Sequence, residues 1–288
     1  MIIGIIGAGA WGTGLAHMVA RGGNNVILWS FDGDFAHFDG LDLPRNVVLT
    51  REMQDLQRCD LWIAVTPAAF FRATMINASK FYKNQPIIVC TKGAEPQTGK
   101  FMTEVLSETV KPAKQNIGVL SGPQFAGEVA HGVPTGSTFA GSRKIWNRAG
   151  AAFNKIYLEY SRDILGTQLC GVGKNAVSVI AGYVNIAGGG ENETAMIMTR
   201  AWNEIINLGQ KIGAKKDTFL GLCGLGDLLL TATSRTSRNF SAGIAIANGE
   251  KPIGTVEGIS ALAAIIKRAK EKEIDMPVLT HMHKILSK

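Results

Sequence analysis

The chain has 288 residues, of which 46% are hydrophobic, and its 30 basic and 23 acidic side chains give a net charge of +7. This length suits one large domain or two moderate domains with full cores. The four cysteines lack the spacing of a disulfide framework or a metal site, which makes a reducing cytoplasm the expected compartment. No long basic block or nucleic-acid-binding motif is present, so we expect the positive charge to attract small anions and not nucleic acid.

The chain begins with an apolar stretch, MIIGIIGAGAWGTG, that five glycines interrupt. No basic segment precedes this stretch, and the glycines break any continuous apolar run. It is therefore atypical of a signal peptide or a membrane-spanning helix, and we predict no integral membrane segment. Instead, residues 2–6 are predicted to form a buried strand, residues 7–12 a G-x-G-x-x-G turn, and the following residues a helix to about Arg21.

The three glycines of this turn have distinct expected roles. Gly7 permits the tight turn after the strand, Gly9 lets the backbone approach a pyrophosphate, and Gly12 lets the helix pack closely on the sheet. The phosphates would lie at a helix N-terminus, where free N–H groups favour an anion. The pattern favours a dinucleotide site, and the alternative is a glycine-rich turn in an unrelated α/β fold.

The first half of the chain alternates short apolar strands with helical stretches. Such alternation predicts a parallel sheet with helices on both faces and ligands beyond the carboxyl ends of the strands. The further strands are expected at 26–30, 47–49, 61–65, 87–90 and 117–120, with helices at 68–83 and 100–110.

Beyond about residue 165 the apolar residues recur at helical period. Helices are expected at 171–187, 194–212, 240–248, 257–272 and 277–286, without convincing strands between them. We therefore predict an α/β fold, in which a Rossmann-type parallel sheet domain at residues 1–165 binds a dinucleotide. An all-α domain at residues 166–288 follows and is expected to bind substrate and carry catalysis.

Seven short motifs occur in an order that resembles the NAD(P)-dependent glycerol-3-phosphate dehydrogenase family of bacterial type. They are G-A-G-A-W-G-T at 7–13, T-K-G at 91–93, S-G-P-Q-F-A-G-E at 121–128, G-V-G-K-N at 171–175, G-L-G-D-L-L-L-T at 224–231, S-R-N at 237–239 and V-E-G at 256–258. The resemblance covers nearly the whole chain. It implies an oxidoreductase that reversibly reduces dihydroxyacetone phosphate to sn-glycerol 3-phosphate, with NAD or NADP, for glycerophospholipid synthesis.

Lys174 is the candidate proton donor and acceptor. Reduction of a ketone needs an acid for the developing alkoxide, and burial among small residues would lower the lysine pKa from about 10.4 toward neutrality. The alternative from the residues alone is a surface lysine at a helix start, and the resemblance places the proton-transfer lysine of the family at Lys174. Asn175 and Asp227 are the expected supports. Asp227 alternatively caps a helix that begins near Leu228.

The substrate phosphate is expected at Ser237, Arg238 and Asn239, where a hydroxyl, a guanidinium and an amide precede a helix. The alternative there is an ordinary solvated helix cap. The resemblance adds Lys92 as a contact to both ligands, Arg238 as a contact to the cofactor as well, and Gly122 and Gln124 near the substrate. Together with Asp227, these residues form the expected substrate-binding set.

The cofactor-binding residues that the resemblance implies are Gly7, Gly9, Ala10, Trp11, Gly12, Phe31, Lys92, Ala126, Arg238 and Glu257. Members of the family often carry a basic residue where this chain has Ser30 and Phe31. Asp32 can accept from a ribose hydroxyl, or it points to solvent and starts a turn with Gly33, and no arginine or lysine follows it before Arg45. We therefore expect NADH to serve at least as well as NADPH, unless Arg45 or Arg51 folds back toward a 2′-phosphate.

Two other functions remain open from the sequence. One is a β-hydroxyacid dehydrogenase of the 6-phosphogluconate type, although its lysine and asparagine are several residues apart and here they are adjacent. The other is a non-catalytic dinucleotide-binding redox sensor, which has no need of Lys174, Asp227 and Arg238. No metal is expected, because the histidines lack acidic or cysteine neighbours at ligand spacing. A homodimer is compatible with the sequence.

Overall fold

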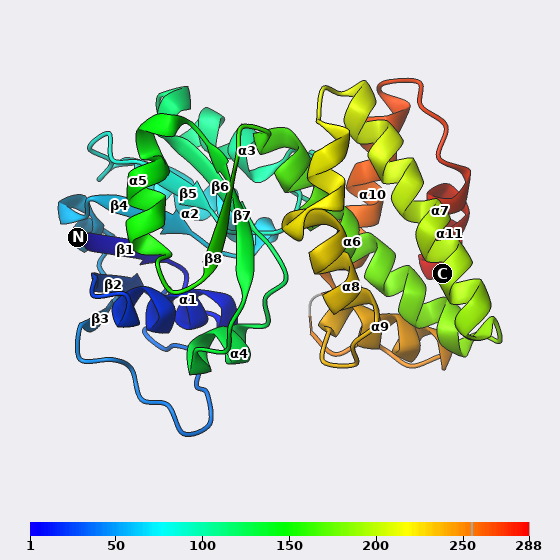
Figure 1. The fold of residues 1–288 in the computed structure, drawn as a ribbon, viewed down its shortest axis with the longest axis horizontal. Helices are drawn as coiled ribbons and strands as arrows, with labels where there is room; N and C mark the ends of the chain where they lie inside the picture. The colour runs from blue at the N-terminus through cyan, green and yellow to red at the C-terminus, as the bar shows by residue number, and fades with distance from the viewer. Residues whose placement is uncertain (255, 288) are drawn as a thin grey trace. The chain divides into compact units, whose positions relative to one another are not determined.

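The computed structural model describes residues 1–254 and 256–287. They form two compact units (Figure 1). Residues 1–91 and 102–164 form the sheet unit, and residues 92–101 and 165 onward form the helical unit. A single boundary after residue 165 would assign segment 92–101 to the first domain, but the structure places it with the helical unit.

The sheet unit contains one eight-stranded sheet with the order β3-β2-β1-β4-β5-β6-β7-β8. All neighbouring strands are parallel except β6 and β7, which are antiparallel. The order of the first six strands is that of a dinucleotide-binding Rossmann sheet. The strands are β1 (Ile2–Ile6), β2 (Asn25–Trp29), β3 (Val47–Thr50), β4 (Leu61–Ala64), β5 (Ile87–Val89), β6 (Ile117–Ser121), β7 (Gly136–Gly141) and β8 (Tyr157–Ser161).

Helices cover both faces of this sheet because alternate side chains of each strand enter different cores. Ile3 and Ile5 of β1 join the core that α1, α4 and α5 complete, while Ile6 joins the core on the other face with α2 and α3. The helices of this unit are α1 (Ala10–Arg21), α2 (Ala68–Ser79), α3 (Met102–Thr109), α4 (Ala126–His131) and α5 (Arg143–Ala152), with short 3-10 turns at Met53–Arg58 and Lys114–Asn116. The expected Rossmann-type sheet is thus confirmed.

Two strands depart from the sequence prediction. β7 and β8 were not predicted, because the sequences GSTFAG and YLEYS contain no apolar run. β7 is nevertheless fully buried, since it lies inside the sheet between β6 and β8. Its antiparallel pairing with β6 makes the sheet mixed and not purely parallel.

The helical unit has no strand among its described residues apart from an isolated bridge between Ala94 and Phe101. Its helices are α6 (Ile164–Ile186, whose first residue belongs to the sheet unit), α7 (Gly190–Lys211), α8 (Asp227–Ala232), α9 (Arg238–Ala247), α10 (Glu257–Lys270) and α11 (Pro277–Leu286). A 3-10 turn at Lys216–Leu220 and a π-helical turn at Leu222–Gly226 precede α8. The predicted all-α character of this half is confirmed, and α6 begins seven residues before its predicted start.

Helix α6 is the central element of the helical unit. Most of its residues are buried, and its apolar side chains pack in one core with those of α7, α10 and α11. Among the described residues it is also the one helix that is long and apolar enough to cross a membrane, but 89% of its apolar window is buried inside the protein. This burial is typical of the core helix of a folded domain.

Candidate active site

The glycine loop after β1 leaves a space that a phosphate group can approach. Gly7 has a φ of +120°, which side chains disfavour, and a Cβ on Gly12 would lie 1.8 Å from the carbonyl oxygen of Gly7. A Cβ on Gly9 would meet no atom within 4 Å. Gly12 therefore keeps the helix close to the strand, while Gly9 faces open space at the N-terminus of α1, as an anion site requires.

Unpaired polar atoms gather around the carboxyl ends of the parallel strands. Trp11 Nε1 follows β1, Thr66 Oγ1 follows β4, and Ser121 Oγ and Gln124 Nε2 lie at and beyond the end of β6. These buried atoms have no hydrogen-bond partner in the part of the chain that the structure describes. Buried polar groups are normally satisfied, so the edge carries the donors and acceptors that a polar ligand would use. The residues present thus fit a dinucleotide.

Gln124 is held in place by its other amide atom. The hydroxyl of Ser137 on β7 donates to Gln124 Oε1 at 2.8 Å, which leaves Nε2 as the donor without a partner. Gly122 has a packing role, because a Cβ there would lie 2.6 Å from the carbonyl oxygen of Gly136. Ala126 begins α4, and its carbonyl oxygen approaches Gly14 of α1 so closely that a Cβ on that glycine would lie 2.8 Å away.

The end of β2 carries charges of both signs. Asp32 accepts from the Ser30 hydroxyl at 2.7 Å, and that bond is the main reason that its pKa is lowered. Phe31 is 84% exposed. Because Trp29 pairs with Thr50 on β3, Arg51 lies at the same edge, and a Cβ on Gly33 would be 2.8 Å from Arg51 Cδ. Arg51, one of two arginines that could meet a 2′-phosphate, therefore lies beside Gly33 at the carboxyl end of β2.

In the helical unit, two lysines share one buried carboxylate. Lys92 Nζ lies 2.7 Å from Asp227 Oδ2, and Lys174 Nζ lies 3.2 Å from Asp227 Oδ1. Asp227 is 1% exposed and Lys174 is 8% exposed. Lys174 and Asp227 lie 82 and 135 positions after Lys92 in the chain, yet the three side chains meet at one point. The sequence predicted that Asp227 supports Lys174.

Burial and charge set the protonation of this cluster. Burial lowers the pKa of Lys174 to about 8, against the opposing attraction of Asp227. Burial alone would raise the pKa of Asp227, but the ammonium groups of Lys174 and Lys92 outweigh it and the pKa is lowered. The carboxylate therefore stays ionised while the lysine titrates near neutral pH, which suits a general acid and base.

Lys174 and Asp227 do not occupy the helix positions that their alternative roles, a surface lysine at a helix start and a helix cap, would require. Lys174 lies in the middle of α6 and not at a helix start, and a Cβ on the adjacent Gly173 would lie 3.0 Å from Ile205. Asp227 is the first residue of α8, whose N-cap is Gly226, so the proposed capping role of Asp227 is wrong. The π-helical turn before α8 precedes this carboxylate directly, and such turns are frequent at functional sites.

Thr231 is a member of the cluster to which the sequence analysis assigned no role. Its hydroxyl accepts from Lys174 Nζ at 3.0 Å and donates to the backbone carbonyl oxygen of Asp227 at 2.7 Å. The signal was present in the sequence, because a residue four positions after Asp227 lies on the same face of a helix. Thr231 gives the lysine a neutral partner beside its charged one.

Asn175 and Asn239 form a chain of hydrogen bonds next to the cluster. Asn175 Nδ2 donates to the Lys92 carbonyl oxygen at 3.1 Å, and Asn239 Nδ2 donates to Asn175 Oδ1 at 2.9 Å. The backbone N–H of Gly258 donates to Asn239 Oδ1 at 3.0 Å. Asn239 therefore lies beside the predicted catalytic residues.

Ser237 and Arg238 behave differently from Asn239. Ser237 Oγ accepts from the N–H of Phe240 and caps α9, while Arg238 is exposed. Burial raises the pKa of Glu257, and the positive charge of Arg238 opposes that effect. The triplet thus combines a helix cap, an exposed guanidinium and a part-buried amide hydrogen bond, and its phosphate-binding role stays a prediction.

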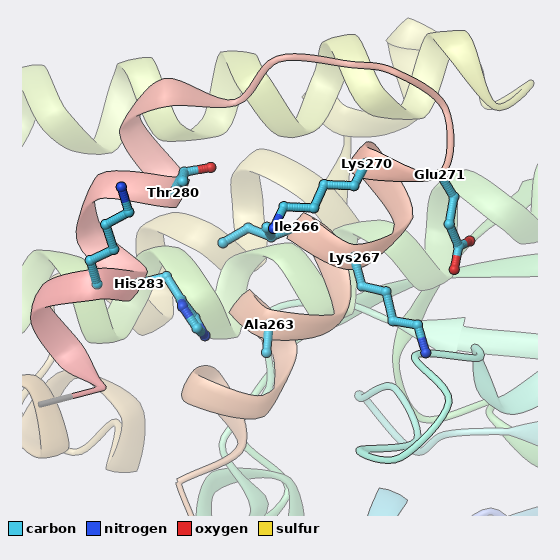
Figure 2. A pocket seen from close by; sticks show the side chains of 8 residues that line it. Ala263, Ile266, Lys267, Lys270, Glu271, Thr280 and His283 are labelled. Atoms are coloured by element: carbon cyan, nitrogen blue, oxygen red, sulfur yellow. The ribbon is translucent and has the colours of Figure 1, made fainter.

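A separate groove of about 430 Å³ lies between α10 and α11 (Figure 2). Its lining combines apolar atoms with exposed lysines and includes none of the cluster residues: Ala263, Ile266, Lys267, Lys270, Glu271, Thr280, His283 and Lys284. We therefore do not assign the substrate to it. Across the described residues no group of three or more His, Cys, Asp or Glu could hold a metal ion.

Family models match both halves of the chain. The model described as NAD-dependent glycerol-3-phosphate dehydrogenase N-terminus matches residues 2–146, and the C-terminus model matches residues 163–288. The chain belongs to this family. A glycerol-3-phosphate dehydrogenase [NAD(P)+] from Bradyrhizobium diazoefficiens is 36% identical over 96% of this chain and 89% of its own, and one from Erythrobacter litoralis is 34% identical over 99% and 92%.

Solved structures agree with this assignment. The crystal structure of glycerol-3-phosphate dehydrogenase from Coxiella burnetii has a TM-score of 0.91 and 27% identity, and the match covers 99% of this chain and 94% of that chain. A ketopantoate reductase from Ralstonia eutropha has a TM-score of 0.68 at 16% identity, which shows a shared fold. The family match favours neither a 6-phosphogluconate-type enzyme nor a redox sensor.

Proposed function

We propose that this protein catalyses the reversible reduction of dihydroxyacetone phosphate to sn-glycerol 3-phosphate with NAD or NADP. The observation that carries the proposal is the buried carboxylate of Asp227 between the ammonium groups of Lys92 and Lys174. Family membership supplies the substrate class, since the named relatives are glycerol-3-phosphate dehydrogenases.

In this proposal the two units have different tasks. Residues 1–91 and 102–164 bind the dinucleotide through Gly7, Gly9 and Gly12, with Ala10, Trp11, Phe31 and Ala126 as further contacts. Residues 92–101 and 165 onward bind substrate and transfer the proton. The bound nicotinamide supplies or accepts the hydride at the carbon that is reduced or oxidised. Gly122 and Gln124 of the sheet unit are further proposed substrate-binding residues.

Lys174 moves the proton. In the reductive direction its ammonium group donates a proton to the carbonyl oxygen as negative charge develops there, and neutral Lys174 then regains a proton from solvent. In the oxidative direction the neutral amine accepts the hydroxyl proton. Asp227 stabilises the ammonium form and fixes its position, while Lys92 adds positive charge beside the same carboxylate.

The substrate phosphate has cationic and amide groups available in the helical unit. Lys92, Arg238 and Asn239 supply charge and donors, and Ser237 caps the helix α9 that Arg238 begins. Glu257 and Arg238 are the proposed cofactor contacts of this unit. This arrangement would favour a phosphorylated ketone over the same ketone without phosphate.

NAD and NADP are both compatible with the end of β2. The Asp32 carboxylate can accept from a ribose 2′-hydroxyl, which supports our expectation that NADH serves at least as well as NADPH. Arg51 lies at the same edge and offers a positive charge to a 2′-phosphate. We further propose a cytoplasmic homodimer that supplies glycerol 3-phosphate for glycerophospholipid synthesis.

A spectrophotometric assay tests the reaction directly. Purified protein is expected to oxidise NADH or NADPH with dihydroxyacetone phosphate at a much higher kcat/KM than with dihydroxyacetone. Similar kcat/KM values for the two ketones would show that no phosphate site exists. Turnover of a β-hydroxyacid such as 6-phosphogluconate in place of dihydroxyacetone phosphate would favour the other enzyme class.

A further inference from the structure

The start of helix α10 is capped from a neighbouring helix. The first N–H groups of a helix have no partner within it, and the N-cap residue Val256 supplies no side-chain bond. Asn239 Oδ1 from α9 accepts from the N–H of buried Gly258 instead. A buried N–H without a partner would be costly, so this single amide oxygen satisfies a group that α10 cannot satisfy itself.

The contact depends on a very close approach of α10 to α6. A Cβ on Gly258 would lie 2.3 Å from Val179 Cγ2 and 2.5 Å from the carbonyl oxygen of Asn175. A larger residue would push α10 away from Asn175. The glycine thus allows one side chain, Asn239, to bridge the two helices.

The groups at the two ends of this chain of hydrogen bonds determine which way the side-chain amides of Asn175 and Asn239 face. The Lys92 carbonyl oxygen can only accept, so Asn175 must present its NH₂ group there and its oxygen to Asn239. The Gly258 N–H can only donate, so Asn239 must present its oxygen there and its NH₂ group to Asn175. Both requirements are met at once, and reversing either amide would bring like groups together at two places.

We propose that Asn239 is a positioning residue that couples the start of α10 to the main chain of Lys92 through Asn175. The inference rests on the proposed function, in which Glu257 beside Gly258 contacts the cofactor and Lys92 contacts substrate. The three bonds connect four segments, namely 92–101, α6, α9 and α10. A shift of α10 on cofactor binding would therefore move the main chain of Lys92, whose side chain binds Asp227 and is proposed to bind substrate. Asn239 retains one N–H for the phosphate, because its NH₂ group carries two hydrogens.

Two substitutions distinguish the two hydrogen bonds of the Asn239 side chain, to Gly258 and to Asn175. Asn239→Asp keeps an oxygen for Gly258 but replaces the donor to Asn175 with a second oxygen, whereas Asn239→Ala removes both contacts. Asn248→Asp is the matched control, because Asn248 is exposed at the C-cap of the same helix. Amide hydrogen exchange at Gly258 reports the first contact without any need for turnover, and kinetics with dihydroxyacetone report effects that do not involve a phosphate.

The expected pattern has three parts. Gly258 exchanges faster in Asn239→Ala but stays protected in Asn239→Asp and in the control. Asn239→Asp lowers kcat/KM by about tenfold or more with dihydroxyacetone as well as with dihydroxyacetone phosphate, because loss of the part-buried bond to Asn175 displaces Asn175 and Lys92. The control keeps wild-type values in both assays.

Other results would overturn the coupling. A loss that occurs only with the phosphorylated ketone would make Asn239 a phosphate ligand and nothing more, and unchanged Gly258 exchange in Asn239→Ala would refute the bond to α10. A wild-type protein inactive with dihydroxyacetone phosphate would overturn the proposed function instead, and the exchange results would then still decide whether the amide chain exists.

Discussion

The glycine loop of the sheet unit and the lysine cluster of the helical unit represent two ways to build a functional site. The loop occupies residues 7–12, where Gly9 leaves open space for a ligand and Gly12 allows close packing against the Gly7 carbonyl oxygen. The cluster unites Lys92, Lys174 and Asp227, which are distant in sequence, and in it a buried carboxylate meets one buried and one partly buried ammonium group. One site depends on local conformation and the other on the packing of a whole core.

This difference predicts that substitutions at the two regions have separable effects. Added volume at the loop should weaken cofactor binding, because it fills the space for the phosphates. Loss of charge at the cluster should slow the proton transfer, because the general acid is removed or its pKa is changed. Each substitution below therefore either separates these two functions or shows that they are not independent.

Lys174→Ala is expected to have the largest effect. The variant loses its general acid, which corresponds to a fall of about 10²-fold to 10⁴-fold in kcat. Cofactor affinity should stay close to that of the wild type, since the pyrophosphate is bound by the glycine loop. Steady-state kinetics and a fluorescence titration with NADH measure the two quantities, and most of the activity surviving in a folded variant would remove Lys174 from the mechanism.

The pair Gly9→Ala and Gly12→Ala tests the loop with equal added volume. The Gly9 methyl would enter open space, so this variant should fold normally but bind NADH about tenfold or more weakly. The Gly12 methyl would collide with the Gly7 carbonyl oxygen, so this variant should lose thermal stability as well. If Gly9→Ala binds NADH as tightly as wild type, the pyrophosphate does not lie on this loop.

Arg51→Ala is expected to have the smallest effect, on cofactor preference alone. Loss of this charge should reduce kcat/KM for NADPH several-fold, roughly 1 kcal/mol, and leave that for NADH unchanged. Arg45→Ala is the matched control, because Arg45 precedes β3 and therefore lies at the opposite edge of the sheet. Equal effects of the two substitutions would assign the loss of kcat/KM with NADPH to overall charge.

The fold could be predicted from the sequence where apolar patterning is strong. Strand β1 and helix α11 match their predicted limits, and α1 ends at its predicted residue but begins about three residues early, inside the predicted turn. Strand β7 was not predicted because most of its residues are small or polar, and burial inside the sheet gives them their conformation. Strand β8 was not predicted because it is a partly exposed edge strand without an apolar run. Tertiary context therefore determines these strands more than local propensity does.

The site could be predicted in part. Motifs identified Lys174, Asp227 and Asn239, but only the packing of α6 against α8 and segment 92–101 shows that Lys92 and Lys174 bind opposite oxygens of one carboxylate. Patterning also could not show that segment 92–101 leaves the sheet unit, because its course depends on contacts such as Arg268 over the ring of Phe101. The roles assigned to the site residues remain predictions.

The central claim is that Lys174 transfers the proton with a pKa set by burial and by Asp227. Its most direct test is the pH dependence of kcat/KM for dihydroxyacetone phosphate reduction between about pH 7 and 10, compared with Asp227→Asn. Reduction needs the ammonium form, so the rate should fall as pH rises through about 8. Loss of the carboxylate, which raises the pKa of Lys174, should move this fall to lower pH. A fall centred near the ordinary lysine pKa of about 10.4, or one that Asp227→Asn does not move, would contradict the account.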